Sequence, residues 1–187
     1  MSSLRNSYIN LTTPLSTSQA FEETIAGKGL KYVAEASVLA IAPLSNYGFE
    51  IVTKDEAVLL LGFDIEFNQE RVEFSLIESP TSVTGATPLV PAPFNVNRPL
   101  DAVPLNTDVN GGTLVVTGGT TIYGPSAGLG VAGQGNKGGA GSLTSSEDFI
   151  WLNSNTTYVL QVDNVSAAAV DLVLVLKLAE GNDFPIG

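Results

Sequence analysis

The stretch VLLLGFDIEFNQERVEFSLIE, Val58 to Glu78, decides the fold class. Every second residue from Leu59 to Phe67 is apolar, and Asp64 and Glu66 occupy positions between them. Side chains of a β-strand alternate between two faces, so this pattern predicts a half-buried strand. Asn68 and Gln69 permit a turn, after which residues 71–76 alternate polar and apolar again. We predict that the two segments pair as a hairpin.

The same period of two recurs along the chain. It is found at Tyr32–Ile41, at 157–163 and at 172–178, and Gly118-Gly119 suits the tight turn of a second hairpin over Thr113–Tyr123. About eight strands with no alternating helices predict an all-β antiparallel β-sandwich of the jelly-roll type. An immunoglobulin-like sandwich is the nearest competitor, but its Cys-Trp-Cys signature is missing.

The composition limits the classes of partner. The 187 residues include 8 basic and 19 acidic ones, for a formal charge of −11, which repels phosphate backbones and anionic lipid surfaces. We therefore expect no nucleic-acid partner. Asp171 and Lys177 interrupt the most apolar stretch, so we also expect no membrane partner. Residues 1–18 lack the apolar core of a signal peptide, so we expect no export by that route.

The chain divides into an arm and a sandwich. Residues 1–26 lack strand periodicity and predict an N-terminal arm, in which residues 17–26 suit a short helix. Residues 27–187 form the predicted sandwich domain. Six prolines in 79–112 and a glycine-dense run at 124–141 predict two long irregular surface loops.

Several kinds of chemistry have no support in this sequence. Cysteine and histidine are both absent, which removes thiolate nucleophiles, the usual Ser-His-Asp machinery and the commonest zinc ligands. Gly128, Gly130 and Gly133 match a dinucleotide fingerprint, but more glycines follow where a helix is needed. The acids mostly alternate outward on strands. We expect no catalytic residue, no cofactor and no metal. An enzyme that uses two carboxylates ranks third among the functional hypotheses.

Three groups of residues are candidate contacts. Val173 and Val175 lie opposite a leucine face and need cover beyond one sheet, which predicts a contact between subunits of a homo-oligomer, most simply a trimer. Arg98 is predicted to clamp the proline-rich loop through Glu78 or backbone carbonyls. In the arm, the predicted anchors on the capsid or a neighbouring subunit are Tyr8, Ile9 and Leu11. The alternative is an arm that packs on its own sandwich.

Two further segments resemble virion proteins of tailed bacteriophages, of the jelly-roll decoration or head-fibre type. They are IESPTSVTG (Ile77–Gly85) followed by FNVNR (Phe94–Arg98), and WLNSNTTYVLQVDNVS (Trp151–Ser166) with the strand that closes at Glu180. The resemblance implies a β-sandwich on the outer capsid surface, assembled in the host cytoplasm and bound to the major capsid protein. The alternative function is a carbohydrate- or receptor-binding module, with exposed Tyr47, Tyr123 or Trp151 as a stacking platform for a glycan.

Overall fold

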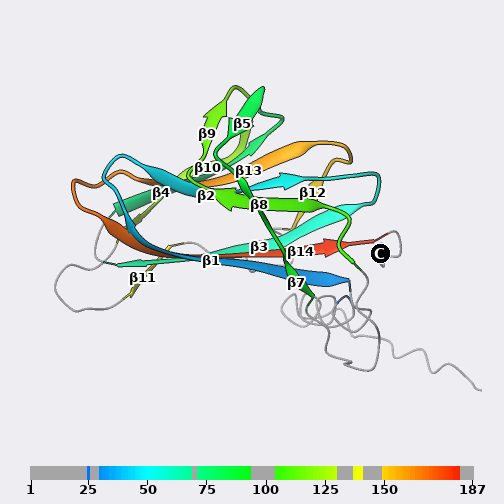
Figure 1. The fold of residues 1–187 in the computed structure, drawn as a ribbon, viewed down its shortest axis with the longest axis horizontal. Helices are drawn as coiled ribbons and strands as arrows, with labels where there is room; N and C mark the ends of the chain where they lie inside the picture. The colour runs from blue at the N-terminus through cyan, green and yellow to red at the C-terminus, as the bar shows by residue number, and fades with distance from the viewer. Residues whose placement is uncertain are drawn as a thin grey trace, which may run out of the picture.

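The computed structural model describes Ile25 and residues 30–68, 71–93, 104–129, 137–140 and 149–181, and it is nearly all β (Figure 1). The longer strands are β1 (Lys31–Ile41), β2 (Asn46–Val52), β3 (Val58–Asn68), β4 (Arg71–Glu78), β8 (Asp108–Gly112), β10 (Thr120–Leu129), β13 (Thr157–Asn164) and β14 (Val170–Glu180). The shorter strands are β5 (Ser82–Thr84), β6 (Thr87–Leu89), β7 (Ala92–Pro93), β9 (Val115–Thr117), β11 (Lys137–Ala140) and β12 (Ile150–Leu152).

The strands form two stacked antiparallel sheets and a small flap. Sheet A has the order β11-β3-β14-β1-β7, and β12 also pairs with β3, whereas sheet B has the order β10-β4-β13-β2-β8-β6. In Figure 1 sheet A lies below sheet B, and the flap, made of β5 and β9, stands at the top. The predicted all-β sandwich is therefore confirmed.

The core lies between the inner faces of the two sheets. Phe63 of β3 contacts Phe74 of β4 edge to face, with ring centroids 5.4 Å apart, and Tyr123 of β10 stacks on Phe74. Leu172, Leu174, Leu176 and Leu178 of β14 are all at most 1% exposed. The apolar set of each alternating strand thus faces the opposite sheet, as the period of two requires.

The predicted hairpin over residues 58–78 is wrong in its pairing. β3 belongs to sheet A, where it pairs with β14, and β4 belongs to sheet B, where it pairs with β13 and β10. The chain crosses from one sheet to the other between them, which lets the aromatic faces of the two strands pack against each other instead of lying side by side. Alternation indicates which face of a strand is buried but not which strand is its neighbour.

The alternation within β3 also breaks at a bulge. Leu60 and Phe63 both face the core, although three residues separate them, while Leu59 and Leu61 face the outside of sheet A. The register against β14 shifts here, from Gly62 opposite Lys177 to Leu60 opposite Leu178. Gly62 has a φ of 150°, which a residue without a Cβ adopts most easily. The prediction that Leu59 and Leu61 share the face of Phe63 is therefore wrong.

The turn at Gly118-Gly119 forms as predicted, but the strands around it do not pair with each other. Both glycines have positive φ, 69° and 91°. β9 pairs with β5 in the flap, and β10 pairs with β4 at the edge of sheet B. The tight turn therefore links the flap to the sandwich.

The two segments predicted to be irregular contain strands where the structure describes them. β5, β6, β7 and β8 all lie within 79–112, and β6 and β7, which contain Pro88 and Pro93, are only three and two residues long. In the glycine-dense run, β10 continues to Leu129 and β11 pairs with the edge of β3. Glycines weaken strands without preventing edge pairing. The predicted arm lies outside the described residues apart from Ile25, which is helical and fully buried.

Candidate functional site

The central feature of the outward side of sheet A is an apolar strip on β14. Val173 and Val175 alternate with the buried leucines and are half-buried. Strand register places Val173 between Ser37 of β1 and Glu66 of β3, and Val175 between Glu35 and Asp64. We call this surface the strip face. The predicted outward orientation of Val173 and Val175 is confirmed, whereas their role in a subunit contact stays a prediction.

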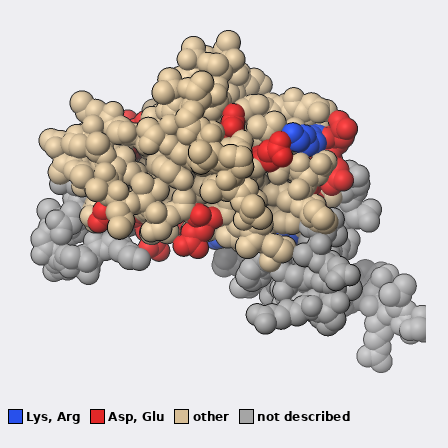
Figure 2. All heavy atoms as spheres, viewed as in Figure 1, with Lys and Arg blue, Asp and Glu red and all other residues tan. Residues whose placement is uncertain are grey.

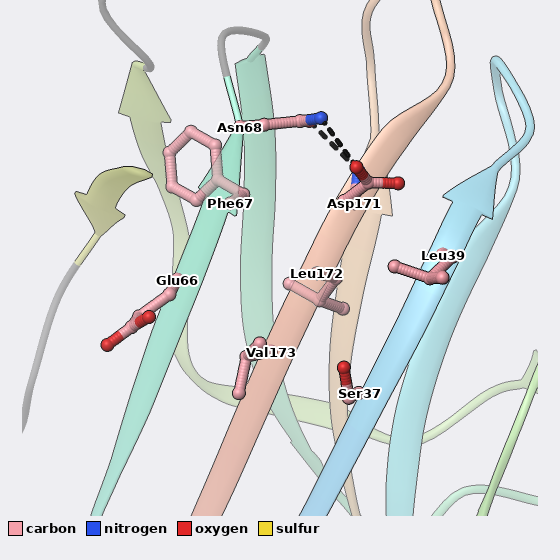
Figure 3. A pocket seen from close by; sticks show the side chains of 8 residues that line it. All are labelled: Ser37, Leu39, Glu66, Phe67, Asn68, Asp171, Leu172 and Val173. Atoms are coloured by element: carbon pink, nitrogen blue, oxygen red, sulfur yellow. Dashed lines mark hydrogen bonds between the residues drawn. The ribbon is translucent and has the colours of Figure 1, made fainter. Parts of the chain in front are cut away.

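A hollow of about 310 Å³ lies at one end of the strip face (Figure 3). Its lining residues are Ser37, Leu39, Glu66, Phe67, Asn68, Asp171, Leu172 and Val173. Leu39 is 77% exposed, which is unusual for so large an apolar side chain. The hollow therefore extends the apolar surface of Val173 towards β1.

The rim of this hollow is held by Asp171. Its Oδ2 accepts a hydrogen bond from Asn68 Nδ2 at 2.9 Å, and its backbone N–H donates to Asn68 Oδ1 at 2.9 Å, as Figure 3 shows. Its Oδ1 accepts from the N–H of Ala40, which has a positive φ of 57°. These bonds join β1, β3 and β14 at the rim, so the hollow is a fixed feature of the sheet.

Acidic side chains border the strip face. Glu35 and Glu66 are exposed on either side of β14, and Asp64 pairs with Lys177 at 2.7 Å. Figure 2 shows acidic residues along the lower margin of the molecule, where sheet A lies. A second strip face laid flat on the first would bring like charges together, which is unfavourable. The surface suits a partner that is apolar in the middle and neutral or basic at its edges.

The opposite end of the same outward surface is covered by the chain itself. Ile25 is fully buried in a small cluster with Leu59, Leu61 and Ala179. The N–H of Leu30 donates to the carbonyl of Ile25 at 3.2 Å, which fixes the chain just before β1. Ile25, the last residue but one of the predicted arm, thus lies on sheet A. Sequence reasoning missed this contact because the bulge at Gly62 turns Leu59 and Leu61 outward.

A buried carboxylate at the end of β14 was also missed. Glu180 is 2% exposed, and its Oε1 accepts hydrogen bonds from Thr107 N at 2.8 Å and Thr107 Oγ1 at 2.6 Å. Its Oε2 accepts from the N–H of Asn106. Burial, reinforced by the charges of Glu180 and Glu56, raises the pKa of Tyr32 to about 12. Glu180 follows the alternation of the buried leucines of β14, which all have even residue numbers. This alternation could have predicted that its side chain is buried.

Glu78, one half of the predicted clamp, is bound to the turn that precedes β13. Its Oε1 accepts hydrogen bonds from Tyr158 OH at 2.7 Å and Asn153 Nδ2 at 2.9 Å. Burial, together with the hydrogen bond to Glu78, raises the pKa of Tyr158 to about 12. Arg98 lies outside the described residues, so the clamp between it and Glu78 stays a prediction.

Asn164 joins the two loops at one end of the sandwich. Its Nδ2 donates to the carbonyls of Ile41, Ala42 and Ala168, and its Oδ1 accepts from Ser166 N and Oγ. Asn164 is 2% exposed, so these bonds satisfy a buried amide. Asn164 therefore has a structural role.

Two of the three aromatic residues proposed as a platform for a glycan are packed on the core. Tyr47 and Tyr123 are half-buried and pack on the core, where their rings contact Phe49 and Phe74. Trp151, on the edge strand β12, is 51% exposed. One exposed ring among the three candidates does not make the flat stacking surface that sugar binding uses.

The three predicted anchors of the arm, Tyr8, Ile9 and Leu11, lie outside the described residues. Within the described ranges, no group of three or more metal-ligating side chains comes together. The same ranges contain no helix long and apolar enough to cross a membrane.

No protein-family model matches this sequence, and neither a curated protein nor a solved structure matches it. What the structure defines is a class: an all-β sandwich whose most distinctive described surface is an apolar strip with acidic margins.

Proposed function

We propose that this protein is a virion accessory protein without catalytic activity, which binds the outer capsid surface of a tailed bacteriophage as a decoration or head-fibre component. The observation that carries the proposal is the strip face, an apolar strip on the central strand of sheet A that is bordered by Glu35 and Glu66, which we assign to the contact between subunits of the decoration oligomer. Such surfaces mark contacts with other proteins. The partner is the major capsid protein, as the sequence resemblance implies, and assembly takes place in the host cytoplasm.

The strand order supports a jelly roll. Successive long strands alternate between the sheets: β1 and β3 lie in sheet A, and β2 and β4 in sheet B. The last strands alternate too, with β12 and β14 in sheet A and β13 in sheet B. Four strands on each side, β12-β3-β14-β1 facing β10-β4-β13-β2, are what two interlocked Greek keys produce. Capsid proteins commonly use this architecture.

The proposed assembly is a homotrimer in which Val173 and Val175 lie in the subunit contact. Both valines are half-buried within one subunit, so a partner can cover the rest of their surface. Each side chain that becomes fully buried adds on the order of 1 kcal/mol per subunit. A trimer repeats this contribution around a closed ring.

The carbohydrate-binding alternative has less support than the capsid-binding proposal. Two of the three aromatic residues that would form its platform are packed on the core. We therefore retain only the capsid-binding proposal.

Quantitative mass spectrometry of purified virions from the phage that encodes this chain tests the proposal. We expect the chain at a copy number that matches a set of capsid lattice sites. Capsids that lack the chain should also bind the added recombinant protein and sediment with it. Absence of the chain from purified particles, together with no co-sedimentation, would refute the function.

A matched pair of variants tests whether capsid binding depends on the oligomer that the strip face holds together. Val175→Asp places a charge on the strip, and Val115→Asp places the same charge on the flap, where Val115 is already 63% exposed. We expect Val175→Asp to reduce co-sedimentation at least tenfold and Val115→Asp to leave it unchanged. Equal binding by the two variants would remove the strip face from the proposal.

A further inference from the structure

We propose that residues 1–21 of one subunit bind the strip face of a neighbouring subunit, with Ile9 and Leu11 against Val173 and Val175. The inference rests on the proposed subunit contact and names the segment that makes it. In this arrangement the arm, and not a second sheet, covers the strip.

The shape of the strip face fits an extended segment. Val173 and Val175 lie two residues apart on β14, and Ile9 and Leu11 have the same spacing. An extended chain places residues i and i+2 on one side, so both pairs can meet at once. The hollow beside Val173, lined by Leu39, adds apolar surface next to the strip.

The charge of residues 1–21 is opposite to that of the strip face. Arg5 is the one charged side chain in residues 1–21, so the segment carries a positive charge and no negative one. The strip face carries the exposed Glu35, and Lys177, which follows Val175 on the same face, is paired with Asp64. Sheet-to-sheet contact between copies would oppose like charges, whereas the arm brings an opposite charge to the acidic margin.

The position of Ile25 and the length of the arm make the contact feasible. Ile25 is anchored on the outward side of sheet A, against Ala179. Between Ala179 and Val173 lie six residue steps of β14, roughly 20 Å at strand spacing. The 14 residue steps from Ile25 to Leu11 extend to at most about 50 Å. The arm is therefore long enough to extend past the strip of its own sheet.

Engineered disulfides give a direct test, because the chain contains no cysteine of its own. Tagged chains with Ile9→Cys are mixed with untagged chains with Val173→Cys, exchanged and mildly oxidised. We expect a covalent product of one tagged and one untagged chain on a non-reducing gel. Replacing Val173→Cys by Val115→Cys, on the flap, should abolish that product.

Two outcomes would overturn the inference. One is the absence of any mixed product. The other is a double variant, Ile9→Cys with Val173→Cys, that closes only within single chains, which would place the arm on its own sheet.

Deletion of residues 1–21 separates this inference from the proposed function. We expect the truncated protein to become monomeric by light scattering while its melting temperature stays within a few degrees of the full chain. Arg5→Glu in the full chain should weaken assembly roughly tenfold. If the truncated protein remains oligomeric while Val175→Asp dissociates it, the strip face is the contact but the arm is not its occupant. Capsid co-sedimentation, measured separately, reports on the proposed function.

Discussion

At the scale of single residues, Glu180 shows how a buried charge is kept stable in this sandwich. Its carboxylate receives hydrogen bonds from two backbone N–H groups and one hydroxyl, all from the loop before β8. Glu180→Gln replaces one acceptor oxygen with a donor that faces those N–H groups. We expect a loss of about 2–3 kcal/mol of unfolding free energy, or a melting temperature lower by roughly 5–10 °C.

Asp108→Asn is the matched control for this substitution. Asp108 follows the same loop, and its carboxylate forms an exposed ion pair with Lys54. We expect it to cost less than about 1 kcal/mol. Calorimetry that finds equal losses for the two variants would contradict the account of Glu180.

The raised pKa values of two tyrosines predict that the folded protein becomes less stable at alkaline pH. The pKa values of Tyr32 and Tyr158 are raised from 10.0 to about 12 in the folded protein, with burial as the main cause. The unfolded chain therefore loses these protons first, so the stabilisation is complete below pH 10 and is lost as the pH rises towards 12. Thermal melts from pH 8 to 12 should show this decline.

Spectrophotometric titration of the phenol groups provides the check. The chain has 5 tyrosines, and we expect some of them to ionise only near pH 12 or on unfolding. In Tyr32→Phe with Tyr158→Phe the phase near pH 12 should shrink, and Tyr47, whose pKa burial also raises, should account for what remains above pH 10. Ionisation of every tyrosine near pH 10 in the folded wild type would contradict the predicted shifts.

At the scale of elements, β3 shows what can and cannot be read from the sequence. The period of two correctly predicted the buried Phe63, Ile65 and Phe67 and the outward Asp64 and Glu66. It did not predict the bulge at Gly62, which needs the register with β14, nor the crossing from β3 to β4, which depends on contacts distant in sequence. Local alternation defines faces, whereas sheet membership is a property of the whole chain.

The bulge itself yields a prediction. Gly62→Ala adds a Cβ at a φ of 150°, a backbone conformation that costs a residue with a side chain on the order of 1–2 kcal/mol. The expected result is a lower midpoint of denaturant unfolding. Ser75→Ala, on the outward side of β4, is the control and should change the midpoint little. An unchanged midpoint for Gly62→Ala would show that the bulge can shift to another residue.

At the scale of the whole molecule, the candidate site was only partly predictable. The position of Val173 and Val175 followed from alternation opposite a leucine face. The acidic margin required the register that places Glu35 and Glu66 beside β14, and the covering by Ile25 required the bulge. Neither feature is local in sequence. The fold class, in contrast, follows from strand patterns that are local, and so it could be predicted.

Multi-angle light scattering of the wild type, Val175→Asp and Val115→Asp tests most directly whether the strip face is a contact surface. One chain has a mass of 19.4 kDa, so the proposed trimer, at three times that mass, is about 58 kDa. We predict about 58 kDa for the wild type and Val115→Asp at micromolar concentration. For Val175→Asp we predict 19.4 kDa with an unchanged circular dichroism spectrum. A wild type of 19.4 kDa, or a Val175→Asp variant that keeps the mass of the wild type, would contradict the central claim.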